Sequence, residues 1–158
     1  MKAATVQEIK EALNHLPPGQ VADLCLRLVK FKKDNKELVT YLLFESGQAA
    51  DYLEAVKKEI RQDFSLINSS QLYFAKKSLR RILRNISKQV KYISSKESEA
   101  ELLLTFCISL KESGIPYKNS QALVNLFQAQ LKKIRKLQEG FHEDLQYDIS
   151  RELKKLGE

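Results

Sequence analysis

Apolar residues recur at helical spacing along most of this chain, and turn-forming residues separate the periodic stretches. The pattern predicts helices over residues 6–15, 20–33, 37–46, 49–67, 72–93 and 99–113. A last apolar stripe steps by three or four residues from Leu123 to Leu156 and keeps its phase across Gly140. We therefore favour one long final helix, bent at Gly140, over two separate helices, and a break at Gly140 is the alternative because Gly is unfavourable within a helix.

Residue types at the ends of these stretches support the predicted boundaries. Thr5 and Glu8 have the spacing of a capping box, and Pro18 suits the first turn of a helix. Asp34 and Asn35 predict a break after the second helix, and Asn119 or Ser120 predicts the cap of the last one.

Three of the predicted helices are apolar on nearly all sides, which is typical of buried helices. Residues 21–31, 38–44 and 102–110 are therefore expected to form the interior. We expect six side chains in particular to be nearly fully buried, namely Leu24, Leu28, Leu42, Leu103, Phe106 and Leu110. Cys25 and Cys107 lie in the same apolar surroundings and are expected to be small core residues.

The fold class that follows is all-α, with six or seven helices in a single domain over residues 1–158. Only five Gly and three Pro are present, which fits helices joined by short loops. A faint internal repeat at an offset of 65 residues pairs Leu38–Leu42 with Leu103–Cys107. The helices could thus form a short α-α superhelix of the armadillo or HEAT type, or an irregular bundle.

Composition indicates an ordinary globular protein, with 43% hydrophobic and 30% charged residues. The first residues mix charged and apolar side chains, unlike a signal peptide. The longest uncharged apolar run, residues 102–110, is too short to span a bilayer. Two cysteines in apolar surroundings suggest a reducing compartment, so we expect a cytoplasmic location.

Charge is distributed very unevenly along the chain. The segment from Phe64 to Lys96 contains eight basic and no acidic residues, whereas the other 125 residues carry 19 basic and 20 acidic side chains. On a helical wheel of residues 72–93, the apolar and basic side chains occupy separate arcs. The basic arc, here called the basic face, consists of Lys76, Lys77, Arg80, Arg81, Arg84, Lys88 and Lys91.

Three aromatic residues lie in or beside this arc, namely Tyr73, Phe74 and Tyr92. The arrangement predicts a binding protein in which the cations contact nucleic acid phosphates, and the aromatic rings stack on bases if they are exposed. Non-specific binding to RNA or DNA is the first hypothesis. The alternatives are a solvated or internally paired helix face, a membrane surface, or a protein-interaction module with an acidic or helical partner.

The residues needed for catalysis or metal binding are sparse. No P-loop, GxGxxG, HExxH or GxSxG motif occurs, so we expect no enzyme activity and no cofactor. Glu139 and His142 have the spacing of a di-iron ligand pair, but the chain lacks the second such pair that this site needs. We therefore predict no metal site, and a hydrogen-bonded core or boundary role for His142.

Four segments of the chain carry a resemblance to a known group of proteins: Leu16–Gly19, Leu24–Leu28, Asn35–Glu45 and His142–Asp148. In this order they resemble an uncharacterised family of small helical bacterial proteins. The resemblance covers most of the chain and implies an all-helical fold in a bacterial cytoplasm. It implies no activity, because none is assigned to that family.

Overall fold

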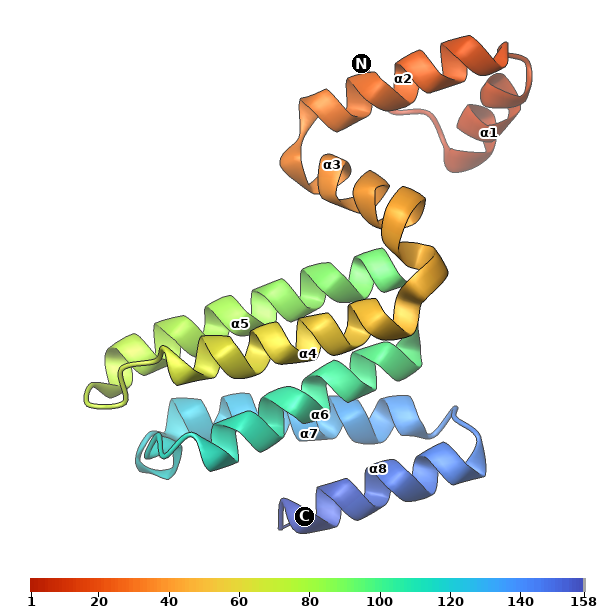
Figure 1. The fold of residues 1–158 in the computed structure, drawn as a ribbon. Helices are drawn as coiled ribbons and strands as arrows, with labels where there is room; N and C mark the ends of the chain where they lie inside the picture. The colour runs from red at the N-terminus through yellow and green to blue at the C-terminus, as the bar shows by residue number, and fades with distance from the viewer. Residues whose placement is uncertain (158) are drawn as a thin grey trace. The chain divides into compact units, whose positions relative to one another are not determined.

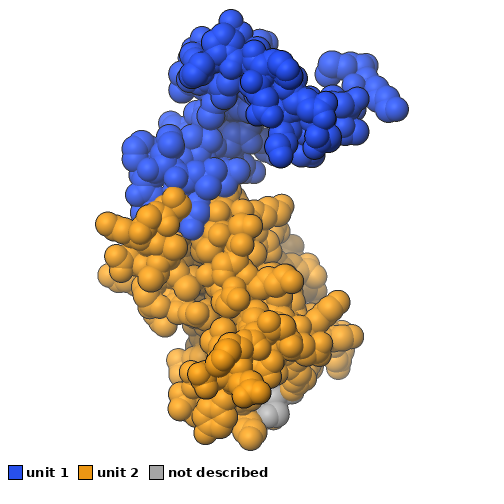
Figure 2. Space-filling view, turned by 90° about the vertical axis from the view of Figure 1, so that its right-hand side faces the viewer, with its two compact units in different colours: residues 1–45 blue, residues 46–158 orange. Residues whose placement is uncertain are grey.

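The computed structural model describes residues 1–157, and every regular element among them is a helix (Figure 1). The predicted all-α class is therefore confirmed. The chain divides into two compact units, residues 1–45 and 46–158 (Figure 2). The prediction of one domain over the whole chain stays a prediction, and each unit is described here by itself.

The N-terminal unit contains α1 (Val6–Asn14), α2 (Pro18–Phe31), α3 (Lys33–Thr40) and the π-helical turn η1 (Tyr41–Glu45). The predicted capping box is present, because the Thr5 backbone N–H donates to Glu8 Oε2 at 2.7 Å. Pro18 occupies the first turn of α2 as expected. The break after α2 lies at Lys32, in extended conformation, and not at the predicted Asp34 and Asn35.

Burial in the N-terminal unit contradicts the prediction. Among residues 1–45, all of them described, Tyr41 is the only buried side chain. Leu24, Leu28 and Leu42 are 43%, 50% and 54% exposed, so residues 21–31 and 38–44 do not form an interior. Cys25 is half-buried. Three short helices within the unit cannot enclose side chains that point in all directions, which explains the difference.

The C-terminal unit begins with the short turn η2 (Ser46–Gln48) and continues through α4 (Ala49–Ser65), α5 (Leu72–Ile93) and α6 (Lys96–Glu112). After η3 (Tyr117–Asn119) come α7 (Gln121–Gln138) and α8 (Glu143–Lys155). α4 and α5 form a helical hairpin, and α6 packs against both of them (Figure 1). α7 packs on α6 and α8 packs on α7, so α6 lies at the centre of the unit.

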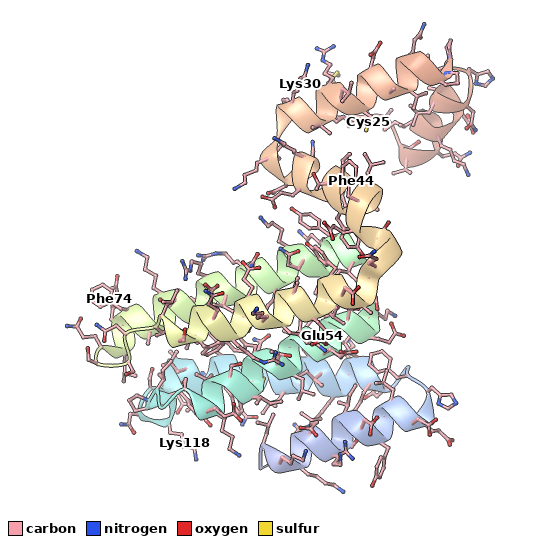
Figure 3. All side chains as sticks on the ribbon, viewed as in Figure 1. Cys25, Lys30, Phe44, Glu54, Phe74 and Lys118 are labelled. Carbon is pink, nitrogen blue, oxygen red and sulfur yellow. The ribbon has the colours of Figure 1, made fainter. Side chains whose placement is uncertain are left out.

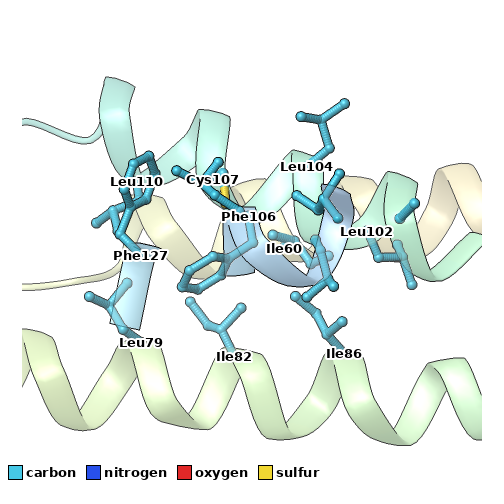
Figure 4. Packing of buried hydrophobic residues seen from close by; sticks show 14 of the residues in the cluster. Ile60, Leu79, Ile82, Ile86, Leu102, Leu104, Phe106, Cys107, Leu110 and Phe127 are labelled. Atoms are coloured by element: carbon cyan, nitrogen blue, oxygen red, sulfur yellow. The ribbon is translucent and has the colours of Figure 1, made fainter. Parts of the chain in front are cut away.

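The core of this unit is built around α6. Leu103, Phe106, Cys107 and Leu110 are buried, as predicted. Side chains of α5, including Leu79, Ile82 and Ile86, point toward them (Figure 4). Phe106 meets Phe64 of α4 edge to face, with ring centroids 5.3 Å apart. The helix whose sequence is apolar on nearly all sides is therefore the one that other helices surround.

The prediction of one long final helix is wrong, because α7 ends at Gln138 and α8 begins at Glu143. The turn between them satisfies its own backbone groups. His142 Nδ1 accepts from the Asp144 N–H at 3.4 Å, and Gln146 Nε2 donates to the Phe141 carbonyl at 2.9 Å. His142 is thus a solvent-exposed N-cap of α8 and not a core or boundary residue.

One charged side chain links α4 to the central helix. Lys57 Nζ lies 2.7 Å from Glu54 Oε1 and 2.5 Å from Glu101 Oε2 of α6, and its side chain is only 13% exposed. Burial disfavours the ammonium form, but the hydrogen bonds that Lys57 donates to Glu101 and Glu54, with the attraction of both carboxylates, outweigh burial and raise the pKa of Lys57. The hydrogen bond with Lys57 lowers the pKa of Glu54.

We expect Lys57→Met to lower the free energy of unfolding by about 1.5–3 kcal/mol at neutral pH, because two charged hydrogen bonds are lost. Since folding raises the pKa of Lys57, its contribution is present at neutral pH and is lost as the pH rises through that raised pKa. Since folding lowers the pKa of Glu54, the contribution of Glu54 to the free energy of unfolding is lost as the pH falls through the acidic range. Urea denaturation of both proteins across pH checks this, and a pH-independent difference would contradict it.

Candidate nucleic-acid interface

The basic face lies on α5, whose opposite side is fixed in the core. Ala75, Leu79, Ile82 and Ile86 are at most 1% exposed and pack in the core cluster of the unit. Because basic and apolar side chains occupy separate arcs of one helix, burial of the apolar arc turns the basic face toward solvent. The sequence pattern therefore predicts correctly which side of α5 is buried.

Most cations of the basic face are solvent-accessible. Five of them are exposed and two, Lys76 and Lys88, are half-buried. The exposed members are Lys77, Arg80, Arg81, Arg84 and Lys91. Between Lys76 and Lys91 the helix rises about 22 Å at 1.5 Å per residue, enough to follow several phosphates of a nucleic acid strand.

Neighbouring carboxylates neutralise the basic face only in part. Arg81 Nη2 lies 3.6 Å from Asp63 Oδ1 of α4, a loose and largely exposed ion pair. No carboxylate of residues 1–157 lies within ion-pair distance of the other four exposed cations or of Lys76. Most of the local positive charge is therefore unbalanced at close range.

The N-terminal half of the basic face surrounds a pocket of about 280 Å³. Its lining consists of Tyr73, Lys76, Lys77, Arg80 and Arg84. These residues are spaced three, four and seven positions apart, so their side chains are neighbours on successive turns of α5. An anion in this pocket would face four cations and one aromatic ring.

The three aromatic residues differ in accessibility. Tyr73 is 76% exposed and Phe74 is 50% exposed, and their rings meet edge to face with centroids 5.4 Å apart. Phe74 lies at the N-terminal end of α5, next to the turn that follows α4 (Figure 3). Tyr92 is only 6% exposed, so it does not meet the condition that a ring must be exposed to stack on a base. Its position just outside the basic arc lets the ring turn toward the protein.

A second group of cations was not foreseen from the sequence. Lys96, Lys133 and Lys136 line a pocket of about 440 Å³ with Glu97, Leu137, Gly140 and Phe141. Glu99 pairs with Lys133 at 2.5 Å, so one of the three charges is locally balanced. The available signal was the run of four cations within Lys132–Lys136, but only packing of α7 beside α6 brings Lys96 to them.

Residues considered for other chemistry do not come together. Among residues 1–157, no three His, Cys, Asp or Glu side chains lie close enough to hold a metal ion. His142 has only Asp144 beside it, at 3.5 Å from Nδ1 to Oδ2. Within the same residues, no helix has the length and apolar content needed to cross a membrane.

Comparison with known proteins finds no matching family model, no matching curated protein and no matching solved structure. The resemblance to small helical bacterial proteins therefore stays a prediction.

Proposed function

We propose that the basic face of α5 binds the phosphate backbone of nucleic acid without sequence specificity, and that the protein is not an enzyme. One observation carries the proposal: five cations of one helix face lack a close carboxylate among the described residues, and four of them line a pocket together with Tyr73. Phosphate groups are the natural ligands of such a surface, because binding releases counterions from the nucleic acid.

Single strands fit this surface better than duplexes. The ring of Tyr73 stands exposed beside Lys76, Lys77 and Arg80, so an unpaired base can stack on it while the adjoining phosphates meet the cations. In a duplex the bases are already stacked on each other, and only the phosphates remain available. We therefore propose that single-stranded RNA or DNA is the preferred ligand.

Binding of a labelled single-stranded oligonucleotide, followed by fluorescence anisotropy at several salt concentrations, tests the proposal. The affinity should fall with salt, and each phosphate contact should contribute about 0.7 to the slope of log affinity against log salt. Oligonucleotides of different sequence should bind with similar affinity. Wild-type protein that binds no RNA or DNA at low ionic strength would refute the function.

Stacking of a base on the ring of Tyr73 leads to a separate prediction. Tyr73→Ala should weaken binding to single strands about five- to a hundredfold, the equivalent of one lost stacking contact. Binding to duplex DNA should change little, because no base is free to stack. Tyr147→Ala is a matched control, since Tyr147 is 69% exposed on α8, outside the basic face. Equal weakening for both ligands would show that Tyr73 acts in another way.

A protein-interaction module is the second candidate function, and one observation favours it: large apolar side chains are exposed in residues 1–45. A pull-down from lysate with and without nuclease separates the two candidates. Partners that bind through nucleic acid are lost after nuclease treatment, whereas partners that bind the protein directly remain.

A further inference from the structure

The exposed apolar surface of this protein is concentrated in its N-terminal unit. Ten of the fourteen large hydrophobic residues that are exposed among residues 1–157 lie within residues 1–45. They are Met1, Val6, Ile9, Leu24, Leu26, Leu28, Phe31, Leu42, Leu43 and Phe44. Because these 45 residues are less than a third of the chain, the distribution is far from even.

This unit buries little apolar surface of its own and is therefore expected to be marginally stable by itself. Its α-helices contain nine, fourteen and eight residues, and isolated helices of this length are marginal in water. Cys25 is a free thiol, so no disulfide supports the unit. Units of roughly this size usually need a disulfide, a metal or association with another chain. The helical structure of residues 1–45 therefore requires that the exposed apolar side chains be buried against another surface.

The exposed apolar side chains lie mainly on α2 and η1, which α3 separates in the chain. Leu24, Leu28 and Phe31 recur at spacings of four and three residues along α2, which makes them one continuous stripe. Leu42, Leu43 and Phe44 follow in η1 and are 54%, 69% and 75% exposed. Figure 3 shows Cys25 and Phe44 on the sides of α2 and η1 that face each other. No other element of residues 1–45 buries these side chains.

We propose that residues 1–45 pair with the same residues of a second copy of this chain. The resulting homodimer would be held by apolar side chains of α2 and η1. A symmetric pair covers the apolar surface of both copies at once, so neither is left exposed. This interface is separate from the basic face and does not depend on nucleic acid binding.

Charge permits this pairing in the N-terminal unit and opposes it elsewhere. Residues 1–45 carry seven basic and six acidic side chains, a net of +1, whereas the rest of the chain carries 20 basic and 14 acidic, a net of +6. Two copies that meet through residues 1–45 therefore bring almost no like charge together. An acidic partner, which would suit the basic face, gains nothing on this nearly neutral surface.

The exposed apolar area is also a large part of what a stable dimer buries. A large apolar side chain removes on the order of 100 Å² from water when it is covered. The seven such side chains on α2 and η1, each at least 43% exposed, thus offer a few hundred Å² of apolar surface. A standard interface buries about 800 Å² per partner, including its polar rim.

The test measures the mass of the full-length protein by light scattering after nuclease treatment, in buffer containing about 0.5 M salt, where nucleic acid is released. We expect a dimer at protein concentrations of about 100 µM, with dissociation on dilution. The helical circular dichroism signal should fall over the same dilution range, because residues 1–45 lose their cover. Wild-type protein that stays monomeric under these conditions would overturn the proposal, whatever else it binds.

A double variant identifies the surface. Leu28→Lys with Phe44→Lys should give a monomer, since the pair would then have to bury four ammonium groups in an apolar interface. The matched control is Leu66→Lys with Tyr147→Lys, which adds the same charge at residues that are 74% and 69% exposed in the other unit. The control should remain a dimer. A dimer that survives the first variant, or is lost in the control, contradicts pairing through residues 1–45.

Discussion

Replacing Phe106 by alanine should lower the free energy of unfolding by about 3–5 kcal/mol, the usual cost of removing a fully buried aromatic side chain. Phe106 has no exposed surface and meets Phe64 edge to face within the core of the C-terminal unit. α4, α5 and α7 all pack against α6, the helix that carries Phe106, so these helices cannot easily close the cavity that the substitution leaves. Leu103→Ala should cost about 2–5 kcal/mol for the same reason.

The matched comparison is Leu24→Ala in α2. Leu24 is 43% exposed, so the same type of truncation should cost less than about 1 kcal/mol in a monomer. Urea denaturation followed by circular dichroism gives all three values, measured at low concentration so that pairing of residues 1–45 does not contribute. A Phe106→Ala protein with an unchanged midpoint, or a Leu24→Ala protein with a loss as large as Leu103→Ala, would contradict the burial described here.

These two helices also show the limit of pattern analysis. α2 and α6 are both apolar on nearly all sides, and this pattern predicts that each packs against other elements. The pattern does not identify those elements. α6 lies among α4, α5 and α7, whereas no element of residues 1–45 encloses α2. Leu38–Leu42 and Leu103–Cys107 illustrate this further, since Leu42 is 54% exposed and the matching Cys107 is fully buried.

The break before α8 was missed for a different reason. Apolar spacing reports which side of a chain faces the core, and that side is the same before and after the turn at Gly140. The break depends instead on side-chain hydrogen bonds of His142 and Gln146 to backbone groups of the turn. Such bonds depend on local geometry, whereas the spacing of apolar residues is unchanged by them.

The candidate site was largely predictable because it lies on one helix. The separation of cations from apolar residues depends only on helical periodicity, and the boundaries predicted for α5, residues 72–93, agree with the structure. The ion pair between Arg81 and Asp63 depends on how α4 packs beside α5, and the pocket near Lys96 depends on α7. The spacing of residues within one helix does not predict contacts between separate helices.

Substitution of Arg80, Arg81, Arg84 and Lys88 by Gln should greatly weaken nucleic acid binding and leave the fold intact. These side chains lie opposite the apolar arc that holds α5 in the core, and surface changes of this kind usually alter stability by less than about 0.5 kcal/mol. Removal of like charges four residues apart, such as Arg80 and Arg84, relieves a small repulsion. Circular dichroism and urea denaturation should therefore match the wild type within error.

The salt dependence of nucleic acid binding should change by a predictable amount in this variant. Each phosphate contact that is lost should lower the slope of log affinity against log salt by about 0.7 for single strands and 0.9 for duplex DNA. Because Asp63 already balances part of the Arg81 charge, loss of Arg81 should lower the slope by less than loss of Arg80 or Arg84. Anisotropy titrations of the variant and the wild type, measured in parallel over a range of salt concentrations, give both slopes.

The decisive control removes the same amount of charge elsewhere. Gln at the exposed residues Lys58, Lys118, Lys132 and Lys154 lowers the formal net charge from +7 to +3, as the α5 variant does. If the basic face binds phosphates directly, the control should keep a slope near that of the wild type, and the α5 variant should not. Equal loss in the two variants would mean that only net charge matters, and α5 would then have no special part in binding. Unchanged binding in the α5 variant would leave the basic face as a solvated helix surface.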